Sequence, residues 1–206
     1  KEALENPNSE SQGFEILLAE LKEVELSKED YFEIVNYCRE RKITFLCTPW
    51  DTPSVDFLEQ FGTQAYKIAS GDMTNFPLIK YVSQTKKPMI ISTGMSKMEE
   101  IEKMVDFVKM QNVPFILLHA NSTYPSPIES LNLSLIPVYA KKFGVLIGFS
   151  GHEVGIIGSI TAVNIGAVVI ERHITLDKKM KGLDHSSSLE PNEFKELVTM
   201  IRLSEK

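Results

Sequence analysis

The chain has 206 residues, of which 43% are hydrophobic and 24% are charged, and its formal net charge is −6. These values are typical of a soluble globular domain with a sizeable core, and the absence of a long basic run argues against a nucleic-acid partner. No apolar stretch approaches the ~18 residues that span a bilayer. Two cysteines and no signal peptide predict a reducing, cytoplasmic location.

The first predicted element is a helix that begins near Ser27. Its apolar residues include Tyr31, Ile34 and Val35, and Ser27 with Asp30 has the pattern of an N-terminal cap. Residues 1–25 carry no strand pattern, and we expect them to form a loop region within one domain that spans 1–206.

Six short runs rich in β-branched and aromatic residues then predict strands. Helical periodicity fills the gaps, most clearly over Ser96–Lys109 and over Pro191–Leu203, where proline suits a first helical turn. The six runs are Ile43–Cys47, Ala65–Ala69, Pro88–Ser92, Phe115–Ala120, Val145–Phe149 and Val168–His173.

Alternation of strand and helix about every 25 residues indicates βα units and a parallel sheet. An open doubly wound sheet and a (β/α)₈ TIM barrel are the two candidate architectures. Polar residues follow every strand, rather than only the strands at one switch point, which favours the barrel. Since such a barrel needs eight strands, we expect an incomplete one, with strands 3 to 8 in this chain and the first two before residue 1.

Two histidines, His152 and His173, fall at or just beyond the ends of consecutive predicted strands. Ligands bind at this edge of parallel sheets and barrels, and imidazole suits several divalent metals. The pair predicts an open metal site that water and substrate complete; the alternative is two structural histidines. His119 lies within a strand and is expected to be a core residue, and His185 lies on a loop that faces either solvent or substrate.

Hydroxyl groups, glycines and one lysine also collect at the strand ends. Serine hydroxyls and free backbone N–H groups near helix N-termini bind anions, and Lys67 adds a charge suited to phosphate. Glu171 and Arg172 interrupt the last apolar strand, and we expect them to pair with other charges that line the core. Asp72 and Asp184 are placed to bind sugar hydroxyls, although turn formation also explains an aspartate in such a loop.

Together, these strand-end motifs resemble the sialic acid (N-acetylneuraminate) synthase family, and the resemblance covers about residues 26–202. The motifs that carry it are Thr48-Pro49, Ala65-Tyr66-Lys67-Ile68-Ala69-Ser70-Gly71-Asp72, Asn75-Phe76-Pro77-Leu78, Ser92-Thr93-Gly94-Met95, Tyr124-Pro125, Gly148-Phe149-Ser150-Gly151-His152, Glu171-Arg172-His173-Ile174-Thr175-Leu176-Asp177 and Asp184-His185-Ser186-Ser187-Ser188-Leu189-Glu190-Pro191.

The resemblance implies a metal-dependent transferase with a TIM barrel followed by a small antifreeze-like domain. It implies condensation of phosphoenolpyruvate with N-acetylmannosamine, its 6-phosphate or a related acylamino-hexose, which gives a nonulosonic acid and phosphate. The parent protein would be a homodimer. By the same resemblance, His152 and His173 would bind Mn²⁺ or Mg²⁺. The residues that would hold phosphoenolpyruvate are Thr48, Lys67, Ser70, Ser92, Ser122 and Ser150, and those that would orient the sugar are Asp72, Tyr124 and Asp184.

Some features of the family have no counterpart here. Its first-strand acid, its second-strand lysine and an arginine from the neighbouring subunit's terminal domain are not found in this sequence. We therefore expect these 206 residues alone to be poorly stable and inactive. Two alternatives remain: another phosphoenolpyruvate-dependent keto-sugar-acid synthase, and a non-catalytic barrel remnant that binds a ligand or partner.

Overall fold

The computed structural model describes residues 22, 25–182 and 184–205. The chain divides into two compact units, Lys1–Phe45 and Leu46–Lys206. In the first unit, helix α3 (Lys28–Glu40) begins with the predicted capping box: the Asp30 backbone N–H donates to Ser27 Oγ, and the Ser27 N–H donates to the Asp30 carboxylate. The predicted loop over 1–25 lies almost entirely outside the described residues.

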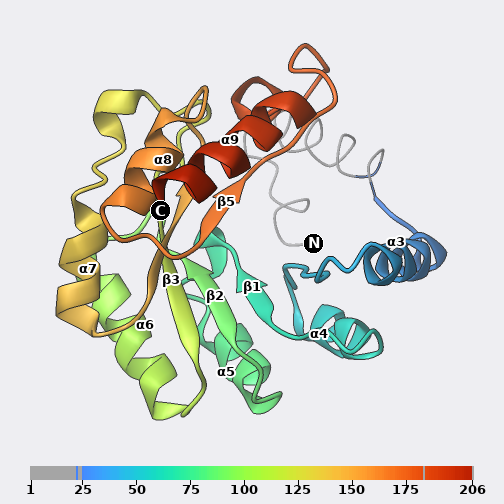
Figure 1. Cartoon of the computed structure of the whole chain (residues 1–206). Helices are drawn as coiled ribbons and strands as arrows, with labels where there is room; N and C mark the ends of the chain where they lie inside the picture. Colours follow the sequence, from blue (N-terminus) through green and yellow to red (C-terminus); the bar gives the residue numbers. More distant parts are fainter. Residues whose placement is uncertain (1–21, 23–24, 183, 206) are drawn as a thin grey trace, which may run out of the picture. The chain divides into compact units, whose positions relative to one another are not determined.

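The second unit contains a five-stranded parallel sheet in which each strand pairs with the next one along the chain (Figure 1). The strands are β1 (Tyr66–Ile68), β2 (Met89–Ser92), β3 (Phe115–Ala120), β4 (Ile147–Gly151) and β5 (Ile170–Arg172). This sequential order favours the barrel, because a doubly wound sheet reverses its strand order at a switch point. The fold is an incomplete TIM barrel.

Helices precede and follow the strands, as expected for βα units. They are α4 (Thr52–Glu59), α5 (Phe76–Gln84), α6 (Met98–Met110), α7 (Leu135–Phe143), α8 (Ile157–Asn164) and α9 (Pro191–Ser204), together with the 3₁₀ turns η1 (Ser70–Asp72), η2 (Ile128–Ser130) and η3 (His185–Ser187). In α6, Ile101, Val105 and Val108 are buried on one face, and Pro191 opens α9, as the periodicity predicted.

The core lies between the sheet and these helices. Tyr66, Ile68, Ile91, Leu117 and Phe149 are each completely buried, which explains why the strand sequences are almost continuously apolar. The parallel register places Ile68 beside Ile91 and Ile91 beside Leu117. The carboxyl ends of the strands therefore lie along one rim of the half-barrel.

The prediction of a strand over Ile43–Cys47 was wrong, so five of the six predicted strands form. Residues 43–49 adopt no regular secondary structure. The Ile43 backbone N–H donates to Cys38 O at the end of α3, and a boundary between the two units falls after Phe45. Apolar, β-branched sequence forms a strand only where a neighbouring strand supplies ladder hydrogen bonds.

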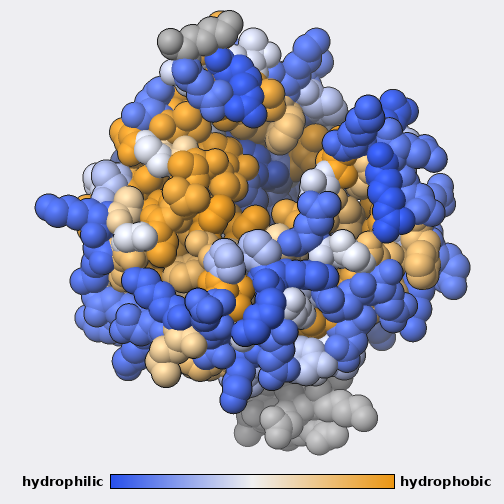
Figure 2. Space-filling model, turned by 60° about the horizontal axis from the view of Figure 1, so that its bottom comes forward, coloured by the Kyte–Doolittle hydropathy of each residue, from blue (hydrophilic) through white to orange (hydrophobic). Residues whose placement is uncertain are grey.

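Several large hydrophobic side chains of the second unit remain exposed, including Val168 (55%) and Leu203 (54%). Hydrophobic residues also gather over much of the face shown in Figure 2. A complete barrel covers both sides of its parallel sheet, so this exposure accords with an incomplete one. Among the described residues, none of the helices combines the length and the apolar character needed to cross a membrane.

Candidate active site

A cavity of about 590 Å³ lies at the carboxyl ends of the five strands. Ten of the eleven residues predicted for the site line it: Thr48, Lys67, Ser70, Ser92, Ser122, Tyr124, Ser150, His152, His173 and Asp184. Residues from separate βα units thus converge because parallel strands end at the same rim.

His152 follows β4 and is held firmly in place. Its Nδ1 atom lies 2.6 Å from Asn121 O, and because a carbonyl oxygen only accepts hydrogen bonds, Nδ1 carries the proton. In the neutral ring, Nε2 therefore bears the lone pair and accepts from the Tyr124 hydroxyl at 2.9 Å. Burial is the main cause that lowers the pKa of His152. The ring is thus kept in the neutral form that binds metals.

His173 follows β5, and its ring lies beside that of His152, with 5.3 Å between the ring centroids. Its Nδ1 atom is 3.7 Å from Asp184 Oδ2. Tyr124 contacts both imidazoles, at centroid distances of 4.0 Å from His152 and 5.7 Å from His173. Two imidazoles that share one cavity fit the chemistry of a divalent metal site.

The described residues contain no group of three or more His, Cys, Asp or Glu side chains placed to hold a metal. A cation bound by His152 and His173 would therefore need oxygen atoms from water or substrate to complete its coordination. Such an open coordination shell is typical of catalytic metals rather than of structural ones.

Lys67 enters the cavity from β1, and its ammonium lies 3.7 Å from the Glu171 carboxylate. The same carboxylate accepts a hydrogen bond from Ser150 Oγ at 2.7 Å. Burial lowers the pKa of Lys67, and the charge of Glu171 opposes that shift. Glu171 thus pairs with a charge in the interior, as predicted, and also lines the cavity beside the candidate substrate-binding groups.

Hydroxyl groups gather near Gly94 in the same cavity. The Gly94 N–H donates to Ser70 Oγ at 3.1 Å, which leaves the Ser70 hydroxyl proton available to another acceptor. Ser92 is 3% exposed, and within the described part of the chain its Oγ has no hydrogen-bond partner. A buried hydroxyl without a partner is costly, and an anionic ligand would satisfy it.

Asp72 is the one predicted site residue that the structure does not bring to the cavity. It lies in η1, where its carboxylate accepts from Asn75 Nδ2 at 2.9 Å. The turn-forming explanation that the sequence left open accounts for this contact.

The two remaining histidines lie outside the cavity lining. His119 is buried, and its Nε2 donates to Leu131 O at 2.7 Å, so it is the core histidine that was predicted. His185 lies half-buried in η3, outside the cavity lining, with Nδ1 2.7 Å from Thr175 Oγ1.

Two contributors were missed by the sequence reasoning. The Asn121 carbonyl orients His152, but a backbone atom leaves no signal in residue identity. Glu153 forms a buried ion pair with Arg172. Its signal was present, because an arginine within an apolar strand requires a partner.

Parallel strands whose carboxyl ends surround a polar cavity define a barrel of the TIM class with a ligand site at its usual end. The chain belongs to the NeuB family, whose model matches residues 1–206.

Named relatives and a solved structure agree with this assignment. The chain is 41% identical to the human N-acetylneuraminate-9-phosphate synthase over all of its own length and 58% of that protein. It is 40% identical to the N,N'-diacetyllegionaminic acid synthase of Campylobacter jejuni, and the match covers 97% of this chain and 59% of that protein. The structure of the N-acetylneuraminic acid synthetase of Leptospira borgpetersenii superposes with a TM-score of 0.89 at 32% identity. The superposition covers 98% of this chain and 70% of that one. The chain thus spans less than two thirds of these two curated relatives.

Proposed function

We propose that this chain forms most of the catalytic barrel of a sialic-acid-type synthase. The reaction joins the enol carbon of phosphoenolpyruvate to the aldehyde carbon of an acylamino-hexose, adds water at the phosphate-bearing carbon and releases phosphate. One observation carries the proposal: the two histidine rings share a cavity with Lys67 and with the unpartnered Ser92 hydroxyl. The relatives named as synthases of nonulosonic acids support it.

In this proposal, His152 and His173 hold Mn²⁺ or Mg²⁺. When bound, the cation supplies Lewis acidity toward the aldehyde oxygen of the sugar. His152 suits the role because its Nδ1 proton is engaged by Asn121 O, which leaves Nε2 as the ring atom that would bind the cation in place of the hydrogen bond that it accepts from Tyr124. Burial raises the pKa of Tyr124, and the charges of Asp184 and Glu171 add to that effect. The phenol therefore stays protonated as a donor beside the histidines.

In this proposal, phosphoenolpyruvate binds in the same cavity. Lys67 provides the positive charge, and the hydroxyls of Ser70, Ser92 and Ser122 provide donors for phosphate or carboxylate oxygens. These donors are fixed before the reaction, so they stabilise the charge that develops as phosphate leaves. Thr48 and Ser150 complete this part of the cavity, and Asp184 faces the sugar. Alignment of both substrates in one cavity reduces the entropic cost of bringing them together.

The identity of the sugar separates the members of the family. The two named relatives make different products, and we propose N-acetylmannosamine, its 6-phosphate or a related acylamino-hexose as the substrate class. We place the protein in the cytoplasm, consistent with its two cysteines in 206 residues. By family resemblance, we expect a homodimer.

The decisive experiment combines metal binding with turnover, using the protein in its complete natural form. Titration with Mn²⁺ should show binding that is lost in a His152→Ala, His173→Ala double variant. Phosphate release from phosphoenolpyruvate should require both Mn²⁺ and an acylamino-hexose of the proposed substrate class. The rate of release should fall at least a thousandfold in the double variant. Binding that survives the double substitution, or the absence of turnover with every sugar, would contradict the proposal. Metal-independent ligand binding would favour the barrel remnant.

A further inference from the structure

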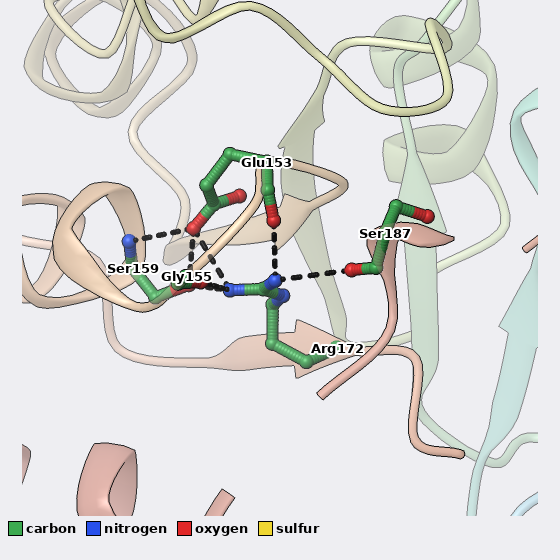
Figure 3. Close-up of polar contacts among 5 residues, drawn as sticks. All are labelled: Glu153, Gly155, Ser159, Arg172 and Ser187. Atoms are coloured by element: carbon green, nitrogen blue, oxygen red, sulfur yellow. Dashed lines mark hydrogen bonds and ion pairs between the residues drawn. The ribbon is translucent and has the colours of Figure 1, made fainter. Parts of the chain in front are cut away.

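Next to the two histidines lies a completely buried ion pair (Figure 3). Arg172 Nη1 is 2.9 Å from Glu153 Oε1, and both side chains are 0% exposed. In sequence, Glu153 directly follows His152, and Arg172 directly precedes His173. Because apolar residues of similar volume often stabilise a core as well as a buried pair does, the charges at these positions need an explanation beyond stability.

Arg172 ties three chain segments together. Nη1 donates to Gly155 O at 2.8 Å and to Ser159 Oγ at 3.1 Å, and Nη2 donates to Glu153 O at 2.6 Å and Ser187 O at 3.3 Å. One guanidinium therefore joins the turn after His152, the first turn of α8 and the loop that carries Asp184. Figure 3 shows these contacts converging on the Arg172 side chain.

Glu153 fixes the same region from the other side. Its Oε1 accepts from the Ser159 backbone N–H at 3.0 Å and from Ser159 Oγ at 2.9 Å, so the carboxylate caps α8. Two glycines leave room for it. A Cβ atom at Gly151 would lie 2.4 Å from Glu153 Oε2, and one at Gly158 would lie 2.9 Å from Oε1.

The hydrogen-bonded ladder between β4 and β5 ends directly before the two histidines. Gly151 beside Arg172 is the last registered pair of β4 and β5, and both histidines follow immediately. The ion pair therefore constrains the backbone at the place where the ladder ends. Two backbone bonds report on the result: the Ser126 N–H donates to His152 O, and the Leu189 N–H donates to His173 O, each at 2.9 Å.

We infer that Glu153 and Arg172 are positioning residues for the metal-binding histidines, an inference that rests on the proposed function. Neither side chain would itself bind the cation. The pair fixes the backbone beside both imidazoles and thereby holds their ring centroids 5.3 Å apart, where both would serve as ligands of one cation. Support of this kind around metal ligands commonly changes metal affinity by about 10–100-fold.

The test uses Arg172→Lys and Glu153→Gln in the complete natural protein. Lysine keeps the charge but cannot reproduce the several donors of the guanidinium, and glutamine keeps the shape but removes the negative charge. We expect each variant to weaken Mn²⁺ binding by about tenfold or more. We also expect amide exchange, followed by NMR, to become faster at Ser126 and Leu189 by a similar factor, while the Met89 amide, bonded to Pro114 O, is unaffected.

Tyr66→Phe is the matched control. Tyr66 is equally buried, and its hydroxyl donates to Val55 O and Glu59 at the amino end of β1. The Tyr66→Phe substitution should lower the melting temperature without changing the Mn²⁺ affinity or the rate of amide exchange at Ser126 and Leu189. If a pair variant does not fold, Ser159→Ala removes one partner of both charges and should show the same effects at smaller size.

The outcomes separate this inference from the proposed function. Pair variants that match Tyr66→Phe in Mn²⁺ affinity and in exchange at both reporter amides would overturn the positioning role. If the unmodified protein binds no Mn²⁺, the proposed function fails, and the amide exchange still decides whether the pair holds the backbone beside His152 and His173.

Discussion

Gly94 is the clearest case in which a missing side chain shapes the cavity. A Cβ atom there would lie 2.2 Å from Ser122 Oγ and 2.8 Å from Ser70 Oγ, so both hydroxyls depend on glycine at this position. We predict that Gly94→Ala displaces them and raises the KM for phosphoenolpyruvate about tenfold, the effect of losing a hydrogen bond to a charged group worth about 1.5 kcal/mol. Steady-state kinetics measures the change.

Gly71→Ala is the control for that substitution. Gly71 lines the cavity, but a Cβ atom there would meet nothing within 4 Å. The KM of the Gly71→Ala variant for phosphoenolpyruvate should stay within twofold of the value for the unmodified protein. An equal rise in both variants would show that crowding of the two serine hydroxyls is not the cause.

His119 should make the stability of the fold depend on pH. Burial lowers its pKa from the ordinary value of 6.5, against the raising effect of the Leu131 carbonyl. Below pH 6.5 the unfolded chain therefore binds more protons than the folded chain, and stability falls as the pH drops through the folded pKa. We predict that His119→Gln, which has no titrating group, reduces the loss of stability between pH 7 and pH 5 in urea unfolding. An unchanged slope would assign the pH dependence to other groups, with His152 the first candidate because its pKa is also lowered.

At the residue scale, the sequence predicts side chains at strand ends better than it predicts their contacts. Position after a strand was sufficient to place Ser70, His152 and His173 on one cavity, because the rim of a parallel barrel collects them. Asp72 also follows a strand, yet its carboxylate is used locally by Asn75. Which of these occurs depends on the turn geometry, and residue type alone does not encode it.

At the element scale, hydrophobic pattern predicted strands where a neighbouring strand exists. The run Phe115–Ala120 forms β3 with the predicted bounds, and Val145–Phe149 is shifted to Ile147–Gly151. The pattern of Ile43–Cys47 is equally apolar but forms no strand. A hydrophobic pattern describes one segment, whereas a ladder requires two. The absence of a strand at Ile43–Cys47 could therefore not be predicted from periodicity.

The start of α8 provides a prediction in which two effects oppose each other. Replacing Gly158 with alanine gains up to about 1 kcal/mol of helix propensity. The added Cβ, however, would lie 2.8 Å from Leu131 Cδ1 and 2.9 Å from Glu153 Oε1, and overpacking a core costs about 1–3 kcal/mol. Because Glu153 is held by several hydrogen bonds, we expect crowding to prevail and the free energy of unfolding to fall.

Thr161→Ala tests the propensity effect without the crowding. Thr161 lies on the same helix but is exposed, so alanine there should leave the free energy of unfolding unchanged or raise it by a few tenths of a kcal/mol. Urea denaturation of both variants gives the comparison. A gain in stability for Gly158→Ala would mean that Leu131 and Glu153 move aside at little cost.

At the scale of the whole molecule, the strand order β1-β2-β3-β4-β5 leaves β1 and β5 with one neighbour each among the described residues. Unpaired edges and exposed apolar side chains favour association with other chains. Val168, just before β5, donates its backbone N–H to Ile147 O while its side chain is 55% exposed. Within the described residues, an edge strand of a parallel sheet thus lies beside an exposed apolar side chain.

We predict that this polypeptide, produced alone, self-associates with increasing concentration and shows no steady-state turnover. Light scattering after size exclusion measures the first property, and phosphate release measures the second. Val168→Lys should reduce association several-fold, because a charged side chain beside an open edge disfavours pairing with another chain, and it should leave the melting temperature nearly unchanged because the side chain is exposed. A monomer at every concentration would show that the edges of β1 and β5 are protected, and turnover by the isolated polypeptide would show that its cavity already holds every group the reaction needs.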